Sequence, residues 1–188
     1  IRKNLPDEKI IKEENKPTLN IYENEKNFAD WPRSHGNNYS NRFSNLKQIN
    51  SNNAHNLKIA WIYLSKDEKN DIQANPIAVN GIIYTPVAGG FVVAIDGSTG
   101  EEIWRSKKFG NFVARRGLVY WKGDAFNKPR LIFSNRERLI ALDAETGKAI
   151  KTFGKKGKVR TGLNVMTPVL LNDKIIIVTW SHAVEVYD

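Results

Sequence analysis

Cysteine is absent from the 188-residue chain, which excludes a disulfide framework, a thiolate zinc site and a thiol nucleophile. No run of 18 apolar residues occurs, so no segment is predicted to span a membrane as a helix. The three histidines, His35, His55 and His182, lack the spacing of metal ligands, and we predict no zinc site. A nucleotide-binding fingerprint is also missing, because Gly89-Gly90 is too short and no helix is predicted after it.

The composition, with 40% hydrophobic and 26% charged residues, excludes a collagen-like, low-complexity or largely disordered chain. The length allows one or two globular domains. The chain begins at Ile1 and shows no signal-peptide pattern, so we expect that any targeting segment is not part of this sequence.

The net charge of +9 lies beyond residue 29, because the six basic and six acidic residues of 1–29 cancel. Its densest cluster, Gly154–Lys158, is interpreted as a solvated loop between two predicted strands. Nucleic-acid binding would require a basic face with interleaved aromatic residues or a helix that reads a groove, and the sequence indicates neither. Polyanion binding stays a weaker alternative, which strong salt-dependent retention on heparin would support.

Apolar runs of β-forming residues begin at Leu57, after two segments of different character. Residues 1–29 are charged and rich in asparagine, and we interpret them as an N-terminal arm. Asp30–Arg42 combines turn formers with Trp, His and Tyr, which favours a structured loop. The later runs are separated by turn residues such as Asn80-Gly81, so the body is predicted to be all-β. These runs are Leu57–Tyr63, Pro76–Val79, Ile82–Thr85, Phe91–Ile95, Leu131–Phe133, Leu139–Leu142 and Ile175–Val178.

An internal repeat is the most informative feature of the sequence. The stretch Ala94–Gly100 recurs as Ala141–Gly147, 47 positions later, and a third copy begins at Val186–Asp188 after a further 45. In the shared Asp-x-x-Thr-Gly turn, the carboxylate can accept backbone N–H groups and the glycine can adopt the left-handed conformation. Trp104, four residues after the first turn, is placed to pack flat between neighbouring sheets. A period of about 40–50 residues with four short strands predicts β-propeller blades, and a solenoid-like stack of open sheets is the lesser alternative.

The predicted architecture is an all-β, incomplete β-propeller of about three four-stranded antiparallel blades with an irregular N-terminal arm. The blades are expected near residues 57–107, 111–153 and 163–188, with the last one truncated. Unpaired edges and an open blade face should make such a chain aggregate or associate.

Three stretches resemble the family of pyrroloquinoline quinone (PQQ) dehydrogenases. The repeat with its tryptophan is similar to the family's tryptophan-docking motif, Trp31–Asn50 with Asn56–Trp61 resembles its N-terminal signature, and Arg116–Trp121 resembles its Arg-Gly-x-x-Tyr-Trp segment. The resemblance implies an eight-bladed periplasmic propeller that oxidises an alcohol, sugar or polyol with PQQ and Ca²⁺. Electrons would pass to a cytochrome c or to ubiquinone. Since this chain supplies about three blades, we expect an N-terminal fragment that is inactive alone and associates with a membrane only through parts not present.

Two residues match cofactor-contacting positions of that family. Arg116 corresponds to the arginine that contacts the orthoquinone, and its fork of donors suits quinone or carboxylate oxygens. Gln73 falls where many members carry a glutamate that touches the cofactor, and its amide can still donate a hydrogen bond. The resemblance places the catalytic aspartate and the calcium ligands beyond Asp188, so no catalytic residue and no metal ligand is assigned in this chain.

Several departures from the family pattern bear on the subtype. Phe109-Gly110 stands where many alcohol-oxidising members have adjacent cysteines, Val165 where a cofactor-binding threonine is frequent, and Lys151 where the second repeat would carry its tryptophan. Glu185 aligns with a plain strand position and is interpreted as structural rather than as a calcium ligand. These features favour a glucose-dehydrogenase-like or uncharacterised branch. The alternative from another class is a cofactor-free propeller that serves as an interaction scaffold, similar to the lipoprotein propeller of outer-membrane protein assembly.

Overall fold

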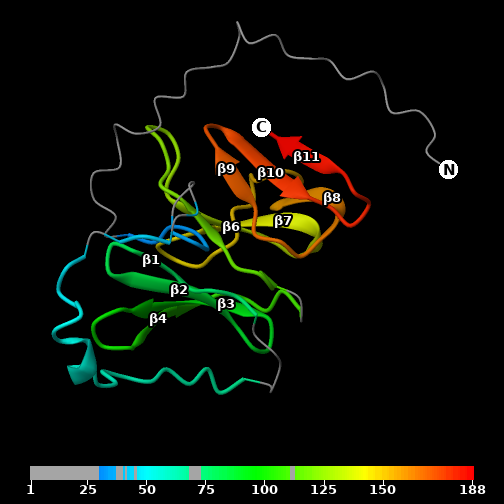
Figure 1. The fold of residues 1–188 in the computed structure, drawn as a ribbon. Helices are drawn as coiled ribbons and strands as arrows, with labels where there is room; N and C mark the ends of the chain where they lie inside the picture. Colours follow the sequence, from blue (N-terminus) through cyan, green and yellow to red (C-terminus); the bar gives the residue numbers. More distant parts are fainter. Residues whose placement is uncertain (1–29, 37–39, 41, 45, 68–72, 111–112) are drawn as a thin grey trace, which may run out of the picture.

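Strands dominate the computed structural model, which describes residues 30–36, 40, 42–44, 46–67, 73–110 and 113–188 (Figure 1). The arm expected over residues 1–29 lies outside these described residues. Within them, a single short 3₁₀ helix, η2 (Ala54–Asn56), precedes the strands, and no α-helix occurs. None of the helical structure in this described part is long or apolar enough to cross a membrane.

The strands form three antiparallel sheets, each of which follows the chain as a meander. The first sheet consists of β1 (Ile77–Val79), β2 (Ile82–Val87), β3 (Phe91–Asp96) and β4 (Glu102–Arg105). The second consists of β5 (Val119–Trp121), β6 (Arg130–Ser134), β7 (Arg136–Asp143) and β8 (Lys158–Asn164). The third contains β9 (Val169–Leu171), β10 (Lys174–Val178) and β11 (Val184–Tyr187).

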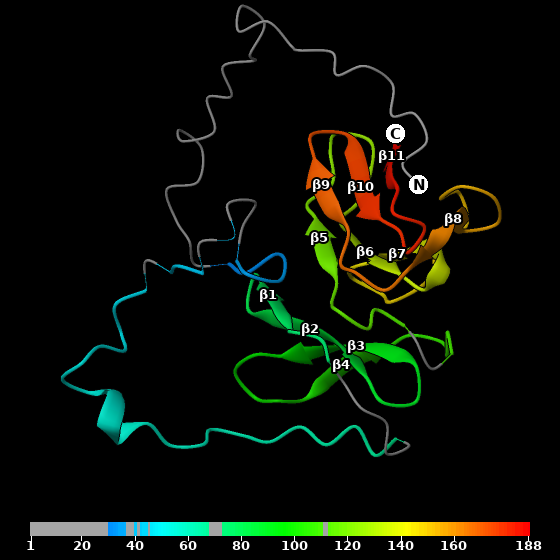
Figure 2. The same ribbon diagram turned by 45° about the vertical axis from the view of Figure 1, so that its right-hand side comes forward.

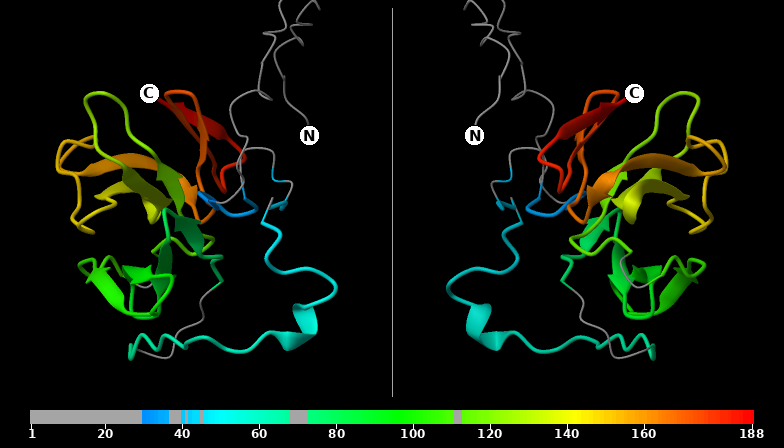
Figure 3. Two further views of the ribbon diagram at one scale, coloured as in Figure 1. Left: turned by 90° about the vertical axis from the view of Figure 1, so that its left-hand side faces the viewer. Right: turned by 90° about the vertical axis from the view of Figure 1, so that its right-hand side faces the viewer.

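The three sheets pack on one another in chain order, as Figures 2 and 3 show. Tyr84 of the first sheet and Phe133 of the second belong to one buried apolar cluster. Ile132 of the second sheet and Ile177 of the third belong to another. The innermost strands β1, β5 and β9 adjoin one another, while the outer strands spread apart. This fan of meanders is the predicted incomplete β-propeller, which is confirmed.

The repeated turn has the geometry that its sequence predicts. Asp96 Oδ1 accepts hydrogen bonds from the backbone N–H groups of Ser98 at 2.8 Å and Thr99 at 2.9 Å. In the second sheet, Asp143 Oδ1 likewise accepts hydrogen bonds from the backbone N–H groups of Glu145 at 3.0 Å and Thr146 at 2.9 Å. The hydroxyl of Ser98 and the two backbone donors hold the pKa of Asp96 below its usual value. The glycine at the end of the first turn, Gly100, adopts φ +76°, where a side chain would be strained.

Trp104 of β4 connects the first sheet to the turn of the second. Its indole Nε1 donates a hydrogen bond to the carbonyl of Ala144 at 3.1 Å, and its ring covers Gly147 so closely that a Cβ there would clash. The position therefore requires glycine for two reasons, a positive φ and the packed indole. Trp104 thus contacts both its own sheet and the turn of the next one.

Two sequence expectations differ from the structure. The run Leu57–Tyr63, expected to begin the first blade, forms no strand and pairs with no sheet in the described part of the chain. Its apolar pattern has another cause, because Trp61 packs on the first sheet while Ile59 and Ile62 remain exposed. The second sheet also extends past residue 153, since β8 completes it. The sequence did not indicate β8, because an outer strand with one exposed face carries Lys, Arg and Thr rather than an apolar run.

Candidate functional site

The innermost strands of the three sheets begin side by side, and the residues that precede them form the candidate site. Asn75, Gly117 and Thr167 occupy the same place in the repeat, each two positions before β1, β5 and β9, respectively. Because these strands adjoin at the narrow side of the fan, their entry residues meet near the propeller axis. Ligand sites form preferentially where separate structural units meet, which makes this junction the candidate site.

The loop Trp31–Gly36 lies along two of these innermost strands. Trp31 exchanges backbone hydrogen bonds with Ala78 of β1, donating at 2.6 Å and accepting at 3.0 Å. One residue later, the carbonyl of Pro32 accepts a hydrogen bond from the N–H of Tyr120 in β5 at 2.8 Å. The loop is therefore tied to both sheets through the backbone and is held against the junction.

Gly117 lies at the centre of the junction. The carbonyl of its neighbour Arg116 accepts a hydrogen bond from Thr167 Oγ1 at 2.7 Å and a longer one from Ser34 Oγ at 3.4 Å. Gly117 has φ +122°, and a Cβ on it would lie 2.7 Å from Ser34 Oγ and 3.5 Å from the carbonyl oxygen of Asn75. Glycine is required here because the backbones and hydroxyls of four segments approach one another closely.

The two residues predicted to contact a cofactor lie on the segments that meet at this junction. Arg116 occupies the turn before β5, and its side chain is exposed. Gln73 lies two residues before Asn75, on the segment that enters β1, and is also exposed. Both side chains are thus accessible to a ligand, while the neighbouring backbone is fixed by the contacts around Gly117.

Sequence reasoning singled out neither Ser34 nor Thr167, although both donate to the Arg116 carbonyl. Ser34 is buried within the loop that the N-terminal signature covers. For Thr167, the signal was present in the repeat itself, because Thr167-Pro168 parallels Asn75-Pro76. The repeat showed that these positions are equivalent, but it did not indicate that they lie close together in the fold.

Arg33 adds a second cation to the loop side of the junction. It bridges to Val119 of β5, and burial lowers the pKa of its guanidinium from the usual value. Arg116 lies on the neighbouring turn, so two arginines flank the junction along the chain. Guanidinium groups bind carboxylate and quinone oxygens through paired N–H donors, so the arrangement suits an anionic, oxygen-rich ligand.

Glu185, interpreted from the sequence as structural, makes hydrogen bonds between the second and third sheets. Both of its carboxylate oxygens accept the backbone N–H of Gly162 in β8, each at 3.1 Å, and the hydroxyl of Tyr187 also donates to it. Burial and this hydrogen bond raise the pKa of Tyr187 to about 12. Across the described residues, no three His, Asp or Glu side chains gather closely enough to hold a metal ion.

A separate hollow lies on the outer side, between the first and second sheets. It has a volume of about 800 Å³ and is lined by Arg105 and by lysines 107, 148, 151 and 156. Lys151, which stands where the second repeat would carry a tryptophan, contributes to this basic lining. The hollow shares no residue with the Gly117 junction.

Comparison with known proteins agrees with the geometry. Residues 31–183 match the family model described as PQQ, the glucose/ethanol/alcohol dehydrogenase β-propeller domain. The chain is 32% identical to the quinoprotein glucose dehydrogenase of Escherichia coli (strain K12), with 81% of this chain and 23% of that protein covered. It is 36% identical to the quinohemoprotein alcohol dehydrogenase of Comamonas testosteroni, with 79% of this chain and 22% of that protein covered.

Solved structures give the same fold. The crystal structure of the Comamonas testosteroni quinohemoprotein alcohol dehydrogenase superposes with a TM-score of 0.60 at 33% identity, covering 79% of this chain and 23% of that one. A europium-containing methanol dehydrogenase superposes with a TM-score of 0.63 at 22% identity, which supports the fold alone. The chain spans about a quarter of the length of the curated relatives that it matches.

Proposed function

The chain belongs to the β-propeller family of PQQ-dependent glucose, ethanol and alcohol dehydrogenases, and from this premise we propose that it forms part of a quinoprotein dehydrogenase of the periplasm. The substrate is a small alcohol, sugar or polyol, and the electrons leave to a cytochrome c or to ubiquinone. Relatives that act on glucose and relatives that act on alcohols both match this chain, which supports the substrate class without selecting a member. The remaining parts of the active site belong to regions of the parent protein outside this sequence.

The meeting of the three strand entries at Gly117 is the observation that carries this proposal. The junction offers exposed Arg116 and Gln73 as hydrogen-bond donors beside a backbone that the Thr167 and Ser34 hydroxyls immobilise. PQQ is a polycarboxylate quinone, and when bound it supplies the two-electron redox chemistry of the reaction. The donors available here fit one side of such a group.

The residues of this chain bind and orient rather than transfer protons. Arg116 would hold quinone or carboxylate oxygens through its N–H fork, and Gln73 would add one amide hydrogen bond. The described carboxylates do not group into a calcium site. We therefore propose that Ca²⁺ is held by residues of the parent protein outside this sequence, and no step is assigned to it here.

Reconstitution of the full-length polypeptide with PQQ and Ca²⁺ tests this function. Dye reduction with a panel of alcohols and sugars should give turnover, and the bound quinone should give its absorbance. Arg116→Ala should weaken PQQ binding by at least tenfold, since one charged hydrogen-bonding group contributes about 1.5–3 kcal/mol, and Arg116→Lys should recover only part of it. Arg138→Ala, at an exposed position of β7, is the matched control. Absent turnover together with absent quinone absorbance would favour the cofactor-free scaffold instead.

A further inference from the structure

The second sheet contains a loop that the first sheet lacks. In the first sheet, the outer strand β4 begins two residues after Gly100, the glycine that ends the repeated turn. In the second sheet, the outer strand β8 begins eleven residues after the equivalent Gly147. Residues 148–157 therefore form an inserted loop between the turn and the outer strand. The loop is not needed to build a four-stranded sheet, because the first sheet has four strands without it.

Backbone hydrogen bonds fix the shape of the inserted loop. Near its start, the N–H of Ile150 donates to the carbonyl of Ala141 in β7 at 3.0 Å. Near its end, the N–H of Lys155 donates to the carbonyl of Lys158 at 2.9 Å, which closes the loop against β8. Gly157, between these last two residues, is buried and has φ +78°. The loop thus presents its side chains from a defined backbone, which lowers the entropic cost of binding a ligand.

Four lysines line the hollow between the first and second sheets. Lys148, Lys151 and Lys156 belong to the inserted loop, and Lys107 follows β4 of the first sheet. All four side chains are exposed, and none of their ammonium groups forms an ion pair with an acidic residue of the described part of the chain. The ammonium of Lys107 lies 5.4 Å from the centre of the Phe109 ring, which leaves its charge uncompensated by a carboxylate. The hollow therefore gathers four positive charges that have no counter-charge.

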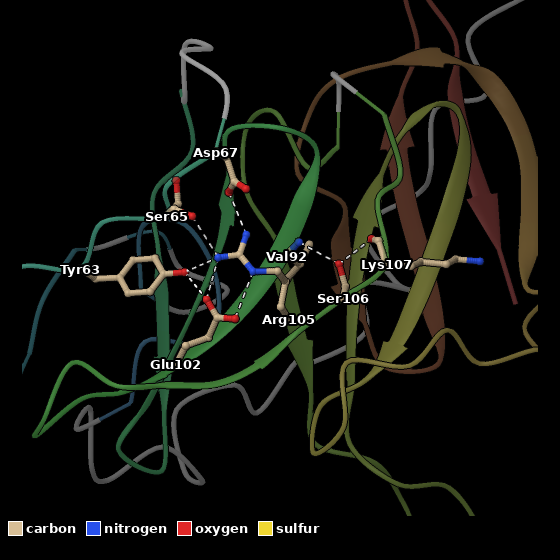
Figure 4. A network of polar contacts seen from close by, with 8 residues as sticks. All are labelled: Tyr63, Ser65, Asp67, Val92, Glu102, Arg105, Ser106 and Lys107. Carbon is tan, nitrogen blue, oxygen red and sulfur yellow. Dashed lines mark hydrogen bonds and ion pairs between the residues drawn. The ribbon is translucent and has the colours of Figure 1, made fainter.

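Arg105, the fifth basic residue of the lining, uses its charge elsewhere. Its guanidinium donates to Asp67 at 2.8 Å and to Tyr63 Oη at 2.9 Å, and it pairs with Glu102 at 2.8 Å (Figure 4). Figure 4 also shows the Lys107 side chain directed away from this network. The two carboxylates thus neutralise Arg105, and no acidic residue of the described part lines the hollow.

The remaining lining residues leave room for a ligand. They are small and uncharged, namely Thr146, Gly147, Ala149 and Gly157. The volume of about 800 Å³ lies within the range of about 300–1,000 Å³ that small-molecule sites have. A cleft lined by charges of one sign concentrates ions of the opposite sign. The hollow therefore favours a small anion that carries several negative charges.

The type of cation indicates the type of anion. The fork of N–H donors on an arginine matches the planar geometry of carboxylate and quinone oxygens, as expected of Arg116 at the junction. A lysine ammonium is a compact point charge on a flexible stem, and it suits phosphate groups, each of which carries about −1.5 to −2 charges at pH 7. Four lysines around one hollow thus fit clustered phosphate groups better than a single carboxylate.

We propose that this hollow binds a small anion that carries several phosphate groups, through Lys107, Lys148, Lys151 and Lys156. Clustered phosphates occur both on soluble polyphosphates or phosphate esters and on the headgroups of anionic lipids. Polyanion binding, the weaker alternative from the sequence, thereby acquires a defined place on the molecule. The proposal does not rest on PQQ binding, because the hollow and the Gly117 junction share no residue.

Titration with inorganic tripolyphosphate tests the site. Calorimetry on the full-length polypeptide without PQQ should show binding that weakens as the salt concentration rises. The Lys148→Gln/Lys151→Gln protein should bind the probe about tenfold more weakly, because two charged contacts are lost. Lys47→Gln/Lys122→Gln removes the same charge from exposed positions outside the hollow and should bind as the unmodified protein does. Equal affinities for the two double variants would overturn the proposal.

A second measurement does not depend on the folding of a variant. The unmodified full-length protein is acetylated with and without tripolyphosphate, and the labelling of each lysine is measured by mass spectrometry. We expect the probe to protect Lys148, Lys151 and Lys156 and to leave the labelling of Lys47 and Lys122 unchanged. The same labelling of the hollow lysines with and without the probe would refute the site.

Vesicles distinguish the two sources of phosphate. In the same protection measurement, tripolyphosphate is replaced by vesicles that contain cardiolipin, a lipid whose headgroup carries more than one phosphate, with phosphatidylcholine vesicles as the control. Protection by tripolyphosphate and by cardiolipin vesicles would assign the hollow to a lipid headgroup. Protection by tripolyphosphate alone would assign it to a soluble anion, and protection by neither probe would overturn the proposal.

Discussion

Replacement of Gly117 by alanine tests whether close approach at the junction, rather than the repeat alone, requires glycine. Its φ of +122° lies where side chains are rarely tolerated, at a cost of about 1–3 kcal/mol. The new Cβ would also lie 2.7 Å from Ser34 Oγ, and relieving such crowding costs about a further 1–3 kcal/mol. We expect Gly117→Ala to lower the free energy of unfolding by about 2–6 kcal/mol in urea denaturation followed by tryptophan fluorescence.

Gly110 provides the matched control for this variant. It has φ +98°, and no atom lies within 4 Å of an added Cβ, so Gly110→Ala carries the backbone strain without the crowding. The difference between the two variants in the free energy of unfolding therefore measures the cost of crowding around the added Cβ. Adding Ser34→Ala to Gly117→Ala should recover about 1 kcal/mol of it in a double-mutant cycle. Equal losses for Gly117→Ala and Gly110→Ala, with no coupling to Ser34, would refute the reasoning.

Two further predictions concern contacts of the first sheet. Trp104→Phe keeps a ring over the next turn but removes the hydrogen bond to Ala144, so the free energy of unfolding should fall by about 1 kcal/mol. An unchanged free energy of unfolding in calorimetry would show that this hydrogen bond does not stabilise the fold. For Glu102, burial raises the pKa, but hydrogen bonds from Arg105 and Tyr63 outweigh it and leave the pKa lowered. A lowered folded-state pKa gives stability that is present above the ordinary carboxyl pKa and is lost as the pH falls through the folded value. In the Glu102→Gln protein, the midpoint of unfolding should therefore fall less steeply as the pH is lowered than in the unmodified protein. The same fall in both proteins would contradict this.

Local features of the fold were predictable from the sequence because they depend on neighbours in the chain. The Asp-x-x-Thr-Gly turn forms as predicted, since the Asp96 carboxylate accepts N–H groups two and three residues away. The period of the repeat then predicted the sheets and their order. The placement of Trp104 followed from the same spacing, because each sheet presents its outer strand to the next turn.

The assignment of Leu57–Tyr63 failed for a physical reason. Its alternating apolar pattern indicates a strand, and the pattern is the same whichever sheet the strand would join. Only the contacts of Trp61 with Gly97 and Gly100 reveal that the segment lies outside the first sheet, in the place that Trp104 occupies for the second. β8 was overlooked for the converse reason, because an outer strand with one exposed face does not need an apolar run.

The candidate site divides in the same way. Arg116 and Gln73 were recognisable from the residue types and their neighbours, and their role in cofactor binding stays a prediction. Their common junction was not recognisable, because Ser34, Gly117 and Thr167 are separated by more than forty residues at each step and meet only when three sheets fan around one axis. The chain alone determined the turns, the repeat and the strands, since these arise from interactions over a few residues. Only the tertiary structure decided which strand entries converge, since this depends on how whole sheets stack.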